Sequence, residues 1–272
     1  MSCAPTRVGE YQRAIDTVLR AFRSSSFAVM RKELLSIITA MFEVNDLIEI
    51  HKSLAGRFDN SLVRHFRTYA SGPVSYMDEN VQTSSNIARN IAFELVVMAK
   101  LTRSGIPLDF RMATDVAAQF DGQSVLFECK RPQSLTSLES NIKKACRQLE
   151  AKYGNAEPSL QSGIIAIDIT KLINPDFMLY AQNDEHALDA GLSRLIDGFV
   201  SEYERLWQRQ RDKRTIAVLL RLSLVGVNKA RNDMLTYCQQ FAITPLHQVG
   251  ERSIETARAL ATAMHETLGR PA

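Results

Sequence analysis

An aspartate, a glutamate and a lysine stand on either side of a two-residue turn signal. The dipeptide Asp121-Gly122 favours a tight β-hairpin, because both residues tolerate the left-handed backbone that such a turn requires. Counting outward from this turn along two antiparallel strands places Asp115 directly opposite Glu128. Lys130 lies two residues beyond Glu128 and therefore projects from the same face of its strand. The alternate residues of that strand, which we expect to point into a core, are Val125, Phe127 and Cys129.

These three polar side chains have the chemistry of a magnesium site. Like charges directly opposite each other on a sheet are unfavourable by up to about 1 kcal/mol unless a cation lies between them. Mg²⁺ prefers one or two carboxylates, retained waters and phosphate oxygens of a substrate to a full protein cage. A neighbouring lysine adds a compact positive charge for an attacking water or for the charge that develops on the phosphate. We therefore expect Asp115 and Glu128 to bind Mg²⁺, with Mn²⁺ as a substitute, beside Lys130.

A third carboxylate lies in an apolar helical pattern that precedes the hairpin. Spacings of four, three, four and three residues predict one helix face, formed by Ile87, Ile91, Glu94, Met98 and Leu101. Glu94 is the one ionisable side chain between Ile91 and Ala99. An unpaired carboxylate there would cost several kcal/mol, so Glu94 needs a partner. Two partners remain open: a salt bridge to a neighbouring Arg or Lys, or a metal ion shared with the hairpin.

The order of these residues resembles the PD-(D/E)XK nuclease superfamily, also called restriction-endonuclease-like. The likeness covers about residues 85–170: a helix with Glu94, then Asp115, then the motif Glu128-Cys129-Lys130 and a further helix. Thr114 stands where the proline of the superfamily's name would be. The resemblance implies an αβββαβ core with a central mixed β-sheet flanked by helices. It also implies that Glu94, Asp115 and Glu128 bind one or two Mg²⁺ ions and that Lys130 completes the site.

The helix that follows the hairpin combines a buried stripe with a basic face. Its apolar positions are Leu138, Ile142, Ala145 and Leu149. The remaining faces, which we expect to be more exposed, carry Lys143, Lys144, Arg147, Gln148 and Lys152. Some members of the superfamily use a glutamine on this helix to orient water or phosphate, and Gln148 resembles that residue. For Lys144 and Gln148, contact with nucleic acid and a merely solvated face remain equally open.

The surrounding sequence predicts an α/β (α+β) fold in two parts. Helical periodicity runs through the first seventy or so residues, and a polar stretch with glycine and proline follows. We therefore place an N-terminal helical region at 1–80 and a nuclease-like domain at 81–272. In the second part, strands are predicted at 114–120, 123–130, 163–170 and 215–224. Helices are predicted at 137–153, 185–211 and 253–268, after one that begins at the N-cap candidates 84–86 and ends before Gly105.

Composition argues against several other function classes. The chain has 272 residues, 45% apolar and 23% charged, which is ordinary for one large domain or two small ones. Its four cysteines are scattered without a CxxC pair, so neither a zinc site nor a disulfide framework is indicated, and a reducing cytoplasm is expected. We find no apolar leader, nucleophile elbow or glycine-rich phosphate loop, and the histidines show no pairing at helical or hairpin spacing. Membrane insertion, a hydrolytic triad and P-loop chemistry are therefore not expected.

These observations predict a metal-dependent nuclease that hydrolyses phosphodiester bonds. DNA is favoured over RNA as its partner on family grounds, and a homodimer would suit an enzyme that cuts both strands with one site per subunit. Asp168 is interpreted as a structural or helix-capping residue rather than a further ligand. Two alternatives stay open: a catalytically silent nuclease fold that acts as a nucleic-acid-binding or interaction scaffold, and hydrolysis of a small nucleotide or phosphodiester.

Overall fold

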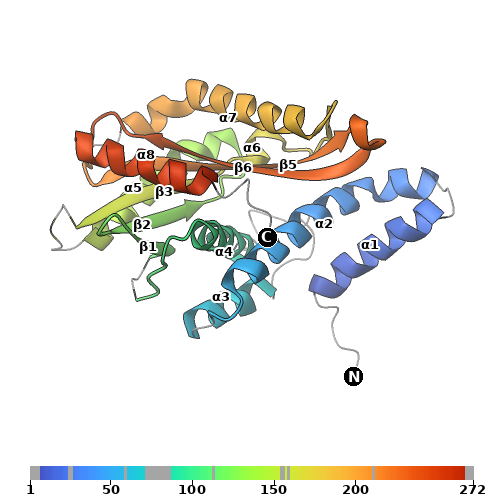
Figure 1. The fold of residues 1–272 in the computed structure, drawn as a ribbon, viewed down its shortest axis with the longest axis horizontal. Helices are drawn as coiled ribbons and strands as arrows, with labels where there is room; N and C mark the ends of the chain where they lie inside the picture. The colour runs from blue at the N-terminus through green and yellow to red at the C-terminus, as the bar shows by residue number, and fades with distance from the viewer. Residues whose placement is uncertain are drawn as a thin grey trace.

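Within the part of the chain that the structure describes, six strands form one mixed sheet (Figure 1). The structure is a computed structural model and describes residues 7–23, 27–57, 60–70, 87–111, 114–153, 157, 160–209 and 212–266. The strands are β1 (Val116–Phe120), β2 (Gln123–Lys130), β3 (Gln161–Asp168), β4 (Tyr180–Gln182), β5 (Thr215–Asn228) and β6 (Met234–Pro245). They follow the order β1-β2-β3-β5-β4, and β6 pairs with β5 along twelve residues. This arrangement confirms the predicted α/β class with a mixed sheet flanked by helices.

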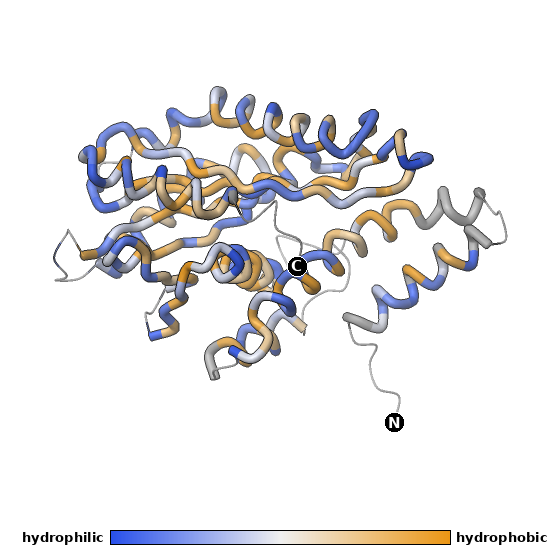
Figure 2. The backbone as a smooth tube through the Cα atoms, viewed as in Figure 1, coloured by the Kyte–Doolittle hydropathy of each residue, from blue (hydrophilic) through white to orange (hydrophobic). Residues whose placement is uncertain are grey.

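Helices cover both faces of this sheet. In the described ranges they are α1 (Arg7–Arg23), α2 (Phe27–Leu54), α3 (Asn60–Ala70), α4 (Ile87–Arg103), α5 (Leu135–Tyr153), α6 (Thr170–Ile173), α7 (Glu185–Gln208) and α8 (Glu251–Glu266). In Figure 1, α7 lies above the sheet and α4 below it, with α2 and α3 beside α4. β2, β3 and β5 pair in parallel and need cover on both faces, and all eight residues of β3 are buried. Apolar segments, orange in Figure 2, accordingly gather along the central strands.

The β1–β2 hairpin has the register that the sequence predicts. Phe120 pairs with Gln123 and Val116 with Phe127, so one further step along both strands brings Asp115 opposite Glu128. Asp121 and Gly122 have φ angles of 50° and 72°, which is the left-handed conformation expected for this two-residue turn. The side chains of Val125, Phe127 and Cys129 are buried, as predicted.

Two strands were not predicted, and one is longer than predicted. The sequence places a strand at 215–224, but β5 continues to Asn228, and β4 and β6 flank it. β6 has no clean alternation of apolar and polar residues, because Gln239 and Gln240 stand side by side in it and most of its positions are only half-buried. The predicted helices at 137–153, 185–211 and 253–268 correspond to α5, α7 and α8 within a few residues. The helix caps at 84–86 and the boundary near residue 80 lie outside the described residues.

The predicted N-terminal helices are present and pack on the rest of the molecule. α2 contacts both α4 and β5, and α3 contacts α4. Buried Glu43 of α2 accepts hydrogen bonds from Tyr11 of α1 (2.8 Å) and Tyr69 of α3 (2.9 Å) and forms an ion pair with buried Arg89 of α4. One carboxylate therefore joins four helices. None of the helices in the described ranges is long and apolar enough to cross a membrane.

Candidate active site

Asp115, Glu128 and Lys130 come together at the open end of the hairpin. Glu128 is fully buried, and its Oε2 lies 3.2 Å from the Nζ of Lys130. The same Nζ lies 3.7 Å from Oδ2 of Asp115, so the lysine stands between the two carboxylates. Asp115 Oδ2 also accepts a hydrogen bond of 2.9 Å from the backbone N–H of Cys129, which fixes the carboxylate beside the second strand.

The side chain of Thr114 links the start of β1 to β2. Its hydroxyl lies 3.1 Å from the carbonyl oxygen of Phe127 and 3.3 Å from Glu128 Oε1, and it can donate to either. A proline at this position has no hydroxyl and could not make these contacts. Thr114, at the position of the proline in the superfamily's motif, therefore adds a side-chain contact between the start of β1 and Glu128.

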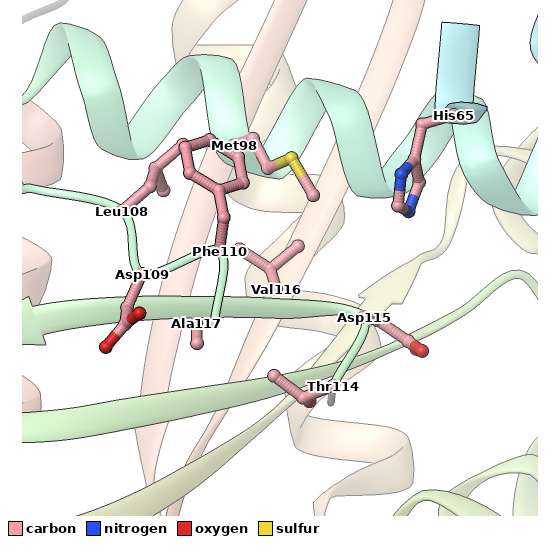
Figure 3. Close-up of a pocket in the computed structure, with 9 residues that line it drawn as sticks. All are labelled: His65, Met98, Leu108, Asp109, Phe110, Thr114, Asp115, Val116 and Ala117. Atoms are coloured by element: carbon pink, nitrogen blue, oxygen red, sulfur yellow. The ribbon is translucent and has the colours of Figure 1, made fainter. Parts of the chain in front are cut away.

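Glu94 of α4 lies close enough to Asp115 to raise the pKa of its carboxyl group. Its side chain is 13% exposed, and Oε2 lies 3.4 Å from Nε2 of His65 in α3. His65 and Asp115 line a cavity of about 30 Å³ that Met98 and Phe110 also line, and Figure 3 shows His65 and Asp115 at one end of it. The partner that the structure gives Glu94 is therefore a histidine, where the sequence offered an arginine, a lysine or a metal ion.

Burial and the neighbouring carboxylates raise the pKa of Asp115 from 3.8 to about 6. Burial is the largest cause, followed by repulsion from Glu94 and then from Glu128. Lys130 and the N–H of Cys129 act in the opposite direction but do not offset these effects. The three carboxylates therefore carry more negative charge than Lys130 neutralises at Asp115, and an added divalent cation would lower this repulsion.

Helix α5 brings a second lysine to Glu128. The ammonium group of Lys152 forms an ion pair with Glu128 Oε1, and its side chain is only 25% exposed. The sequence predicts Lys152 on a more exposed face than the apolar stripe, and there its side chain is half-buried against Glu128. Lys144, Gln148 and Lys152 are four residues apart and therefore follow one face of the helix. Lys144 is exposed, whereas the Oε1 of Gln148 is buried and has no hydrogen-bond partner among the described residues.

The donor types fit a divalent metal, although the side chains are arranged around lysines. Asp115, Glu128 and Glu94 offer the hard carboxylate oxygens that Mg²⁺ prefers, and Gln148 offers an unpaired amide oxygen. In the described ranges, no three His, Cys, Asp or Glu side chains stand close enough together to hold a metal ion in their present positions. Lys130 and Lys152 both pair with Glu128, so metal binding requires these two ammonium groups to move aside.

Comparisons with known proteins found no match to this chain among protein-family models, curated proteins or solved structures. The likeness to nucleases therefore depends on the residues of this chain alone.

Asp168 has a structural role, as the sequence predicts. Its Oδ1 accepts a hydrogen bond of 3.0 Å from the backbone N–H of Thr170, at the start of α6. Its Oδ2 lies 3.0 Å from Arg221 and 3.5 Å from Arg131. Burial alone would raise the pKa of this carboxyl group, but the two arginines and Thr170 hold it below its usual value. Every oxygen of Asp168 is thus used within the fold.

Two residues of the cluster could not be found from local spacing. His65 meets Glu94 from a different helix, 29 positions earlier in the chain, so no periodic pattern relates them. Lys152 meets Glu128 across 24 positions. The one sequence feature that points to Lys152 is its four-residue spacing from Gln148, which was already a candidate for contact with nucleic acid.

Proposed function

We propose that this chain is a metal-dependent nuclease with a PD-(D/E)XK-like core. The observation that carries the proposal is the meeting of Asp115, Glu128 and Lys130 at the open end of the hairpin, with Glu94 near Asp115. Burial and repulsion from Glu94 and Glu128 disfavour a charged Asp115, and a divalent cation would offset that repulsion. DNA as the substrate and a homodimeric assembly are part of the proposal and carry over from the resemblance.

The strand arrangement around the hairpin supports this proposal. Between α4 and α5 the resemblance implies three strands, and the structure has β1, β2 and an isolated antiparallel bridge between Leu108 and Ala118. Backbone hydrogen bonds of 2.8 Å join Asp109 to Ala117 and Gln119 to Pro107, so the segment before β1 follows its edge. β3 then follows α5 and pairs in parallel with β2. In this proposal, the Leu108–Ala118 bridge stands for the first strand of the order αβββαβ.

In this proposal, each residue has a separate task. Asp115, Glu128 and Glu94 would hold Mg²⁺, which when bound polarises the scissile phosphate and lowers the pKa of its water. Lys130 and Lys152, once displaced from Glu128, are positioned to neutralise phosphate oxygens on either side of that carboxylate. Gln148 lies one helical turn before Lys152, and its amide oxygen, unpaired among the described residues, would accept a hydrogen bond from a water.

A cleavage panel tests this function directly. Purified protein with Mg²⁺ or Mn²⁺ is expected to cut at least one of plasmid, single-stranded DNA and RNA, and EDTA is expected to stop it. Glu128→Gln and Lys130→Ala should remove the activity. Glu139→Gln is the matched control, because Glu139 lies on the exposed side of α5 and pairs with Lys143 in the same helix. If wild type and Lys130→Ala show the same trace activity on every substrate, the enzyme proposal fails.

One observation favours a catalytically silent scaffold as the second candidate. Lys130 and Lys152 already pair with Glu128, so that carboxylate is neutralised without a metal. Calorimetry with Mn²⁺ separates the two functions: the nuclease should bind the ion with an affinity that Glu128→Gln weakens, whereas a scaffold held by lysines should give no saturable heat. Cleavage of a model phosphodiester without binding to oligonucleotides would instead identify a small phosphodiester as the substrate.

A further inference from the structure

A second polar cavity lies at the opposite end of the sheet from the candidate active site. Its volume is about 50 Å³, and it is enclosed by the first residues of β2 and β3, the segment before β5 and the first turns of α8. β2 runs from Gln123 at this cavity to Glu128 at the active site, a separation of about 16 Å at 3.3 Å per residue. The two sites are therefore distinct.

Two buried polar side chains in this cavity lack a partner. Ser162 is 4% exposed and Gln161 is 5% exposed, and both line the cavity. Neither the Ser162 hydroxyl nor Gln161 Oε1 has a hydrogen-bond partner among the described residues. Buried polar atoms without partners cost free energy and are uncommon in folded proteins. In the same cavity, Gln123 donates a hydrogen bond of 3.0 Å to Thr256, so these two side chains leave the unpaired atoms of Gln161 and Ser162 available to a ligand.

Positive charge surrounds these unpaired groups. Lys213, Arg214 and Arg252 line the cavity, and the guanidinium of Arg214 is held 5.2 Å over the ring of Tyr153. Arg252 also lies in the first turn of α8, a helix of 16 residues whose N-terminal N–H groups favour an anion.

The nearby carboxylates do not cancel this charge at the cavity. Asp212 accepts hydrogen bonds from the N–H groups of Arg214 (3.0 Å) and Thr215 (3.2 Å), which keep it within its own turn. Glu251 is exposed and does not line the cavity.

We propose that this cavity binds a phosphate group, either free or at the end of a nucleotide. The Ser162 hydroxyl donates to a phosphate oxygen, while Arg252 and Lys213 supply charge at the mouth. The Gln161 amide can turn either its N–H or its C=O inward, so it can donate to a phosphate oxygen or accept from a protonated one. A volume of about 50 Å³ suits one tetrahedral anion and excludes a whole nucleotide. The site does not depend on the proposed nuclease activity, because it uses neither the carboxylates nor the lysines of that site.

Calorimetric titration with inorganic phosphate, in EDTA and at fixed ionic strength, tests this site. Wild type should give saturable binding. Arg252→Gln and Ser162→Ala should each weaken the affinity about ten-fold, the loss of one charge-assisted hydrogen bond. Arg258→Gln is the matched control, since Arg258 is exposed on the same helix and does not line the cavity. Arg252 is exposed, so its variant should fold, which circular dichroism checks.

The melting temperature of Ser162→Ala gives a second readout. Removing an unpaired buried hydroxyl should leave the melting temperature without phosphate unchanged or raised, even though phosphate binding weakens. A nucleoside 5′-monophosphate that binds more tightly than inorganic phosphate identifies a terminal phosphate as the ligand, and equal affinities identify the free ion. The proposal is overturned if wild type shows no saturable binding, or if either Arg252→Gln or Ser162→Ala binds phosphate as tightly as wild type.

Discussion

The carboxyl group of Asp115 is less acidic than an ordinary aspartate, and this has a consequence for stability. Its pKa is raised from 3.8 to about 6, first by burial and then by the charges of Glu94 and Glu128. Between these two pH values the folded chain holds a proton that the unfolded chain releases. The contribution of Asp115 to the free energy of unfolding therefore falls as the pH rises from about 4 to 6 and stays lower above that. The cost is up to about 3 kcal/mol.

Asp115→Asn removes this titration but keeps an oxygen for the N–H of Cys129. The variant should match wild type in urea unfolding at pH 3.5 and exceed it by roughly 2–3 kcal/mol at pH 7.5 without divalent metal. Asp109→Asn is a control of opposite sign. Arg111 holds the pKa of Asp109 far below its usual value, so removing this carboxylate should lower the free energy of unfolding at pH 7.5. Equal stability of wild type and Asp115→Asn at both pH values would contradict the charge imbalance.

A second prediction at this scale concerns Lys152. If its ammonium group neutralises substrate phosphate after leaving Glu128, Lys152→Gln should lower kcat/KM by about ten-fold or more. Lys143→Gln on the same helix is the matched control, because Lys143 is exposed and pairs with Glu139 within its own helix. An equal effect of both substitutions would mean that Lys152 contributes only general positive charge.

The sequence predicts individual residues well where one turn sets their geometry. Asp121-Gly122 fixes the register of the hairpin, and this alone predicts that Asp115, Glu128 and Lys130 share one face. His65 and Lys152 reach the same cluster from helices whose packing depends on the whole core. Their positions follow from tertiary contacts that no local period records.

Among the described strands, β5 pairs with the most neighbours, and its end at 225–228 was not predicted. The sequence predicts this strand only to residue 224, yet it continues to Asn228 and pairs with β3, β4 and β6. A Cβ at Gly226 would lie 2.4 Å from Cδ2 of Leu188 in α7, so that side chain would have to shift. β6 was not predicted, because its polar residues face other elements. Gln240, for example, donates a hydrogen bond of 3.0 Å to Ser193 of α7.

Arg221 of β5 joins this strand to the N-terminal helices. It is 2% exposed and lies 2.5 Å from Asp46 of α2 and 3.0 Å from Asp168 of β3, while Tyr237 of β6 donates to Asp46 at 3.0 Å. Removing one member of a buried ion pair leaves an uncompensated charge, so Arg221→Leu should destabilise the protein by about 3–5 kcal/mol. Denaturant unfolding measures this.

Arg231→Leu provides the comparison for that substitution. Arg231 is 55% exposed and pairs with exposed Glu185, so its loss should cost less than about 1 kcal/mol. If Arg221→Leu were equally mild, the buried network would not hold α2 on the sheet.

At the scale of the molecule, the N-terminal helices are packed into the same structure as the sheet. Glu43 joins α1, α2, α3 and α4, and Arg221 joins α2 to β5. A further contact is made by Phe42 of α2, whose ring meets those of Phe177 and Tyr237 edge to face at 5.7 Å. The boundary predicted near residue 80 follows a change in sequence pattern, whereas these contacts cross it.

The division at residue 80 can therefore be tested by truncation. A chain of residues 81–272 would leave Arg89 without Glu43 and Arg221 without Asp46, and it would expose apolar surface that α2 and α3 cover. We expect this fragment to lose the single cooperative unfolding transition of the full chain and to bind a hydrophobic dye. A chain of residues 27–272, which lacks only α1, keeps both ion pairs and should remain cooperative. If the 81–272 fragment unfolds cooperatively and retains metal-dependent cleavage, the helical region is a separate domain and the site does not need His65.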